Sequence, residues 1–134
     1  MLVIDTNLWV SYALNYHGSV ARQLKALIRV QAFAFSRETF AELVDVLMRE
    51  KFEPYATTKN RKQFLKTLAA QATWVEPQQT ITDCRDPADN RFLETALEAS
   101  ARAILTGDRD LLTLHPFQGI PILTLTEAIA QLQG

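Results

Sequence analysis

The sequence is poor in the residues that mark several classes of protein. It contains one cysteine, Cys84, so no intrachain disulfide can form, which fits a reducing compartment. Its four glycines form no glycine-rich loop of the kind that cradles a dinucleotide or a triphosphate. No apolar run approaches the roughly 20 residues of a membrane span, and Asp5 interrupts the start where a secretory leader would lie. We therefore expect a cytoplasmic protein with no membrane segment.

The sequence also lacks an excess of charge of either sign. Its 14 basic and 15 acidic side chains argue against a domain whose whole surface wraps nucleic acid. The balance differs locally, because residues 49–66 contain six basic residues and two acids, a segment charge of +4. Two interpretations of this segment stay open: a patch that contacts phosphates, or a solvated helix face and turn.

The length and the order of apolar segments predict a fold. The 134 residues, 48% of them hydrophobic, suit one globular domain over residues 1–134. Short apolar segments predict strands at residues 2–5, 32–35, 74–76, 103–106 and 121–124, and segments of helical spacing lie between most of them. Strands that are apolar throughout and alternate with helices indicate a parallel sheet covered on both faces. We expect an α/β fold, a three-layer α/β/α sandwich with a central parallel sheet of about five strands.

Acidic residues follow two of the predicted strands. Asp5 ends the first strand, and Asp108 and Asp110 follow the strand at residues 103–106. An ionised carboxylate next to a buried strand is costly unless it is hydrogen-bonded or binds a cation. Because α/β sheets bind ligands outside the carboxyl ends of their strands, these acids indicate a small acidic site there.

A further acid is brought inward by helical geometry. Asp89 lies three, four and seven residues before Phe92, Leu93 and Ala96, so it shares their apolar face. Asp86 is a natural N-cap for the same helix, and Asp89 could complete the cap. Capping and metal binding are both open for Asp89.

The spacing does not distinguish Glu42. Glu38, Glu42, Asp45 and Arg49 recur at helical spacing, which is typical of a solvated face.

Four short motifs follow one another along the chain: Asp5-Thr6-Asn7, SRETFAEL from Ser36 with Glu42, DNRFLETA from Asp89, and Thr106-Gly107-Asp108. In this order they resemble the motifs of the PIN-domain family, in particular its VapC-like ribonucleases, which are toxin components of toxin–antitoxin systems.

The resemblance implies a site and its supporting residues. The family's acidic quartet falls on Asp5, Glu42, Asp89 and Asp108, as catalytic residues and metal ligands. Positions that support the acids or the phosphate fall on Asn7, Ser36 and Thr106, and Asp110 and Asp86 are neighbours that could replace a ligand or act as caps.

The resemblance also implies strand order 3-2-1-4-5, dependence on Mg²⁺ or Mn²⁺, single-stranded RNA as substrate, an antitoxin protein as partner, and homodimers or larger assemblies. Four converging carboxylates repel one another, and hard divalent ions relieve this repulsion and align water for attack on phosphorus. In this scheme Asp5 anchors the metal, Asp89 and Asp108 complete its ligands, and Glu42 orients water.

Two other functions fit parts of the sequence. The chain could be a non-catalytic module that holds a metal in its acidic pocket and recognises a partner protein. Asp5-Thr6 also resembles phosphatases with an aspartate nucleophile, but their second aspartate, two residues later, is Asn7 here. His17 and His115 belong to no spaced ligand motif, which argues against zinc.

Overall fold

The computed structural model of the chain describes residues 1–132. Five short strands lie in the order of the sequence: β1 (Leu2–Ile4), β2 (Ala34–Phe35), β3 (Thr73–Trp74), β4 (Ala103–Leu105) and β5 (Ile122–Leu123). The α-helices are α1 (Thr6–Leu14), α2 (Ser19–Val30), α3 (Arg37–Leu47), α4 (Thr58–Gln71), α5 (Asn90–Ala99), α6 (Arg109–Leu112) and α7 (Leu125–Leu132). Two 3₁₀ turns, η1 (Glu50–Phe52) and η2 (Pro87–Asp89), precede α4 and α5.

All the strand pairs are parallel, as the sequence predicted. β4 lies between β1 and β5 in a three-stranded sheet, and β2 pairs with β3 in a two-stranded sheet. A single parallel bridge between Leu2 and Phe33 joins the two sheets, and the Leu2 amide donates to the Ala32 carbonyl at 2.8 Å. Across this bridge the neighbours follow the order β3-β2-β1-β4-β5. The predicted single sheet is thus found as two sheets that meet at one point.

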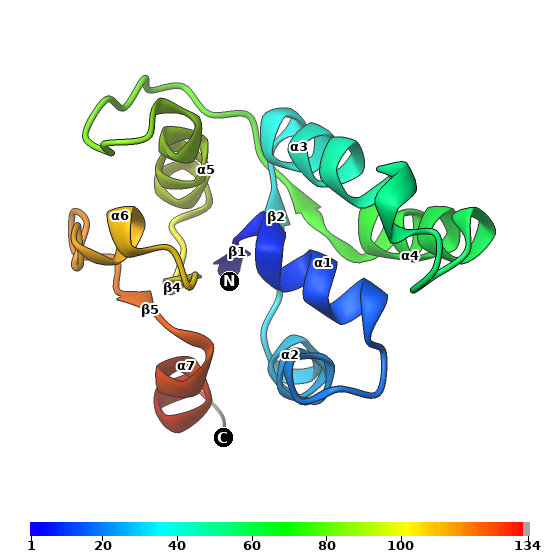
Figure 1. The fold of residues 1–134 in the computed structure, drawn as a ribbon. Coiled ribbons are helices and arrows are strands. Elements are labelled where there is room, and N and C mark those ends of the chain that lie inside the picture. The colour runs from blue at the N-terminus through cyan, green and yellow to red at the C-terminus, as the bar shows by residue number, and fades with distance from the viewer. Residues whose placement is uncertain (133–134) are drawn as a thin grey trace.

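Alternating strand residues point to two separate cores, which makes the fold three-layered. Leu2, Ile4 and Leu105 belong to the larger core, against α1, α2, α3, α4 and α7. Val3 and Ile104 belong to the second core, against α5 and α6. Both faces of the strands are covered (Figure 1), which confirms the predicted α/β class with a parallel sheet.

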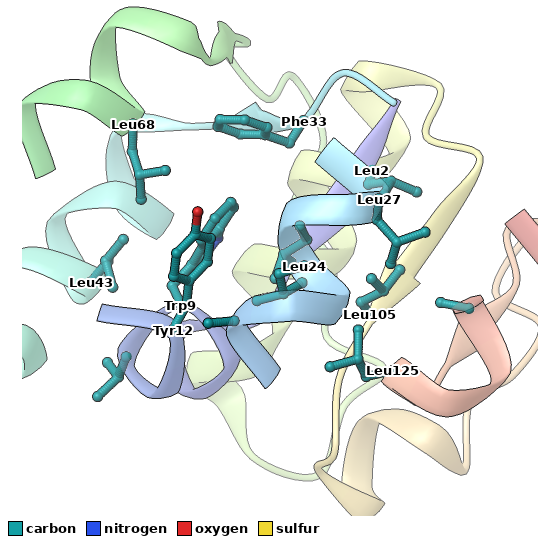
Figure 2. Packing of buried hydrophobic residues seen from close by; sticks show 14 of the residues in the cluster. Leu2, Trp9, Tyr12, Leu24, Leu27, Phe33, Leu43, Leu68, Leu105 and Leu125 are labelled. Atoms are coloured by element: carbon teal, nitrogen blue, oxygen red, sulfur yellow. The ribbon is translucent and has the colours of Figure 1, made fainter. Parts of the chain in front are cut away.

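The larger core is organised around Trp9 of α1 (Figure 2), which is 1% exposed. The ring centre of Trp9 lies 5.1 Å from that of Phe33, 5.8 Å from that of Phe35 and 6.5 Å from that of Phe64. These contacts join α1 to β2 and α4. They fix the helix that begins directly after Asp5.

Three elements differ from the sequence prediction. Helix α1 was not assigned, because its apolar residues do not lie on one face. The helix expected from Pro87 begins as the 3₁₀ turn η2 and becomes α-helical only at Asn90. The expected apolar strand at residues 74–76 is instead β3, whose Thr73 and Trp74 are both exposed because β3 lies at the edge of its sheet.

No helix within residues 1–132 is both long and apolar enough to cross a membrane.

Candidate active site

The first acid of the site, Asp5, is fixed by the two central strands. Its amide donates to the Leu105 carbonyl of β4 at 2.9 Å, and its side chain is 6% exposed. The Thr106 hydroxyl donates to Asp5 Oδ2 at 2.6 Å. Burial raises the pKa of Asp5, and the charges of Glu42 and Asp108 add to this, while the bond from Thr106 opposes it. The costly carboxylate at the end of β1 therefore has a hydroxyl partner, and acidic neighbours as well.

Glu42 reaches the site from α3. Its Oε2 atom accepts a hydrogen bond of 2.6 Å from the Thr6 hydroxyl, which belongs to the first residue of α1. The side chain is half-buried, not part of a solvated face as its spacing indicated. Ser36 begins the same helix as its N-cap: its hydroxyl accepts from the Thr39 amide at 3.2 Å.

Thr95 of α5 was not singled out from the sequence. Its hydroxyl donates to Ser36 Oγ at 2.8 Å and thereby ties the start of α3 to α5, the helix that follows Asp89. The only sequence signal was a threonine on an otherwise apolar helix face.

Asp108 and Thr106 form a linked pair after β4. The Asp108 amide donates to the Thr106 hydroxyl at 3.0 Å, so this hydroxyl contacts both Asp5 and Asp108. Asp108 is also the N-cap of α6, where its Oδ1 atom accepts from the Asp110 amide at 2.9 Å. Thr106 is thus bonded to two of the acids, and the Asp110 amide is bonded to Asp108.

Asp89 is the most perturbed acid of the site. It is 8% exposed, and its Oδ2 atom has no hydrogen-bond partner in the described part of the chain. Burial raises its pKa to about 8, helped by the close carboxylate of Asp108 and by the charges of Asp86 and Asp5. Such a shift marks a carboxylate that lacks the cation or donors that its charged form requires.

The capping interpretation applies to Asp86 but not to Asp89. Asp86 Oδ1 accepts from the Ala88 amide at 3.1 Å and caps η2, with Pro87 in the first turn. Asp89 precedes α5, but its side chain makes no capping hydrogen bond.

A hollow of ≈ 630 Å³ opens beside Asp5 and Asp108, and Glu42 and Asp89 are not among its described lining residues. Asp5, Asn7, Asp108 and Asp110 line it, together with Leu8, Ser11, Gly107 and Arg109. Asn7 is exposed there. A larger hollow of ≈ 710 Å³ lies between α1, α2 and α4, but its described lining contains no carboxylate, so we place the chemistry at the smaller one.

The charges of Glu42 and Asp108 act on Asp5, and those of Asp108 and Asp5 act on Asp89, but the four acids are not drawn into a compact cage. Within residues 1–132, no group of three or more acidic, histidine or cysteine side chains is close enough to hold a metal ion as it stands. The residues still fit a cation chemically, because they are oxygen donors, two of them are held by threonine hydroxyls, and Asp89 Oδ2 is buried without a partner.

Known proteins resemble this chain in sequence and in fold. The family model of the PIN domain matches residues 1–110, most of the chain. The chain belongs to the PIN-domain family. An uncharacterised protein of Methanocaldococcus jannaschii is 29% identical over 116 residues, which cover 85% of this chain and 74% of the relative.

Two solved structures share the PIN fold of this chain. One is the VapBC2 complex of Rickettsia felis, bound to a DNA fragment from its promoter: TM-score 0.59, 16% identity, 92% of this chain and 97% of the other covered. The other is VapC20 of Mycobacterium tuberculosis, described as a toxin that cleaves the sarcin-ricin loop: TM-score 0.57, 10% identity, 90% and 99% covered. At these identities the likeness establishes the fold alone.

Proposed function

We propose that this PIN-domain protein is a metal-dependent endoribonuclease that hydrolyses phosphodiester bonds of single-stranded RNA. The observation that carries the proposal is the state of Asp89, a buried carboxylate with an unpartnered oxygen among three other acids. An enzyme that needed no cation would gain nothing from this arrangement, since each acid raises the cost of ionising the next.

Asp5, Asp89 and Asp108 are the residues that would hold a divalent ion. Such an ion, Mg²⁺ or Mn²⁺, supplies the positive charge that lowers the pKa of a water and stabilises the leaving oxygen of phosphodiester hydrolysis. Thr106 holds Asp5 at Oδ2 and also binds the Asp108 amide, so it fixes the spacing of two of these ligands. Outer-shell hydrogen bonds of this kind orient metal ligands.

Glu42 has a different role in this proposal. Its Oε2 atom is held by Thr6, which leaves Oε1 to orient the attacking water and accept its proton. Asn7 and Asp110, at the rim of the hollow, would contact the phosphate or the outer ligands of the ion. No side chain is required as a nucleophile.

We further propose that the chain is the toxin of a toxin–antitoxin pair acting in the cytoplasm, with an antitoxin protein as partner and a homodimer or larger assembly as its working form. The PIN fold shared with VapBC2 and VapC20 supports this context.

The test is cleavage of a mixed pool of single-stranded RNA by metal-stripped protein, with and without added Mn²⁺ or Mg²⁺. We expect cleavage only with metal, and none by the Asp89→Asn variant. Asp83→Asn is the matched control, because Asp83 is an exposed acid six residues earlier in the same loop region. Metal-independent cleavage, or full activity of Asp89→Asn, would contradict the assignment. If the wild type binds metal but cleaves no RNA, the metal-holding module becomes the better description.

A further inference from the structure

Helix α4 presents one face with three exposed lysines. Lys59, Lys62 and Lys66 lie at positions i, i+3 and i+7, so they project from the same side of the helix. Residues 54–75 contain no acid, whereas the rest of the chain has ten basic and fifteen acidic residues. A chain of near-zero net charge is therefore strongly polarised, with a positive helix and a negative remainder.

The structure separates these lysines from the two arginines of segment 49–66, Arg49 and Arg61. Arg61 is 2% exposed and is bonded to Glu53 and to backbone carbonyls, including that of Leu47 at 2.9 Å, so its charge is used inside the fold. Arg49 pairs with Asp45 at 3.5 Å. The three lysines have no ion-pair partner within residues 1–132. The solvated face left open by the sequence is thus a stripe of uncompensated positive charge.

The helix that carries the stripe and the helix that carries Glu42 share one hydrophobic core. Leu68 of α4 and Leu43 of α3 belong to the same core cluster, beside Trp9 (Figure 2), and Leu43 follows Glu42 directly. The lysines lie on the opposite, solvent side of α4, and α3 and α4 extend together away from α5 and α6 (Figure 1). One helix of this pair carries an acid of the site and the other carries the cations.

Cations outside the acidic site would help the proposed reaction by attracting a polyanionic substrate. The acids repel the phosphates of any polyanion that approaches the site, and Arg109 is the one basic side chain in the described lining of the hollow. Further cations outside the hollow would therefore add attraction for a polyanion. Lysine ammonium groups contact phosphates as point charges and read no base sequence.

We propose that Lys59, Lys62 and Lys66 form a contact surface on α4, outside the acidic site, for the phosphate backbone of single-stranded RNA. The choice of substrate rests on the proposed function, but the contact itself is a binding property that is measured without cleavage. The surface fixes the path of the strand over α4 and adds affinity for RNA of any sequence.

The experiment compares two triple variants that remove the same charge. One is Lys59→Gln with Lys62→Gln and Lys66→Gln. The control is Arg22→Gln with Arg29→Gln and Arg102→Gln, three exposed arginines on α2 and before β4. Binding of a fluorescently labelled, mixed-sequence single-stranded RNA of about 20 nucleotides is followed by anisotropy in EDTA over a range of salt concentrations.

Each phosphate contact on single-stranded nucleic acid contributes about 0.7 to the slope of log affinity against log salt. We expect the magnitude of this slope to be smaller by about 2 in the lysine variant than in the wild type, because three contacts are removed. The arginine variant should keep the wild-type slope. Equal losses in both variants would overturn the proposal, because they would reflect net charge alone. An unchanged slope in the lysine variant, or no salt-dependent binding by the wild type, would also overturn it and would point to an acidic protein as the partner of α4.

Cleavage is assayed separately with Mn²⁺ on the same wild-type protein. If the lysine variant loses slope but the wild type cleaves no RNA, the RNA-binding surface is supported and the nuclease activity is contradicted. If the wild type cleaves RNA but the lysine variant keeps its slope, the nuclease activity is supported and the RNA-binding surface is contradicted.

Discussion

Replacing Asp89 by asparagine should stabilise the metal-free protein in a way that depends on pH. The carboxyl has an ordinary pKa of 3.8 in an unfolded chain and a pKa of about 8 in the fold. The folded chain therefore holds the proton more tightly, so stability is lost as the pH rises from about 4 through about 8. Asparagine has nearly the same shape and does not ionise, so the stability of the variant should not fall over this pH range.

The size of the effect follows from the two pKa values. Each pKa unit corresponds to about 1.4 kcal/mol, so the fold loses at most about 4 kcal/mol of stability by pH 7, because the unfolded chain ionises Asp89 while the fold keeps it protonated. Side-chain rearrangement and water entry reduce such costs, and we expect about 2 kcal/mol. The variant should equal the wild type near pH 4 and exceed it by about this amount at pH 7.

The assay is urea unfolding in EDTA at a series of pH values, for wild type, Asp89→Asn and the control Asp83→Asn. A difference between Asp89→Asn and wild type that stays constant from pH 4 to pH 8 would refute the reasoning. Added Mn²⁺ should then stabilise the wild type more than Asp89→Asn, because only the wild type offers this carboxylate to the ion. Stabilisation of a site mutant in the absence of its ligand is the usual cost of a preorganised site.

Three further predictions follow from the contacts around the site. Thr106→Val removes the hydroxyl bonded to Asp5, so cleavage should fall by about 10 to 100-fold and its acidic pH limit should move upward. Thr6→Val should reduce kcat with little change in KM, by about 10-fold or more, and Thr6→Ser should restore it, because the hydroxyl holds Glu42. Arg61→Met should lower the free energy of unfolding by about 3 kcal/mol in urea, because backbone carbonyls buried with the guanidinium lose their donors.

The sequence predicted those site residues that follow strands. Asp5 and Asp108 could be placed because the carboxyl ends of parallel strands meet at one edge, and a buried strand is visible as a short apolar run. Asp89 could be placed on an inward face by its spacing to Phe92 and Leu93. Its freedom from capping could not be predicted, since Asp86 and Asp89 are both suitable caps, and only the structure shows that Asp86 takes this role.

The local sequence pattern could not distinguish Glu42 from its neighbours, for a physical reason. Its position is decided by Thr6, 36 residues earlier, through a hydrogen bond between two helices. Helical periodicity reports which face of one helix is apolar, and it contains no information about a hydroxyl on another element. Helix α1 was missed for a related reason, because Trp9, Val10 and Tyr12 are buried on several sides, and no clear polar face marks the segment as a helix.

The threonines explain how acids from distant segments share one geometry. Thr6 follows Asp5 in the chain but holds Glu42, and Thr106 precedes Asp108 by two residues but holds Asp5. Each threonine thus lies close in the chain to one acid, while its hydroxyl bonds the carboxylate of another acid. In the proposed site, a shift of β1 or β4 would therefore move two acids together. We expect this crossed pairing to oppose the mutual repulsion of the carboxylates, which the burial of Asp5 and Asp89 makes more costly.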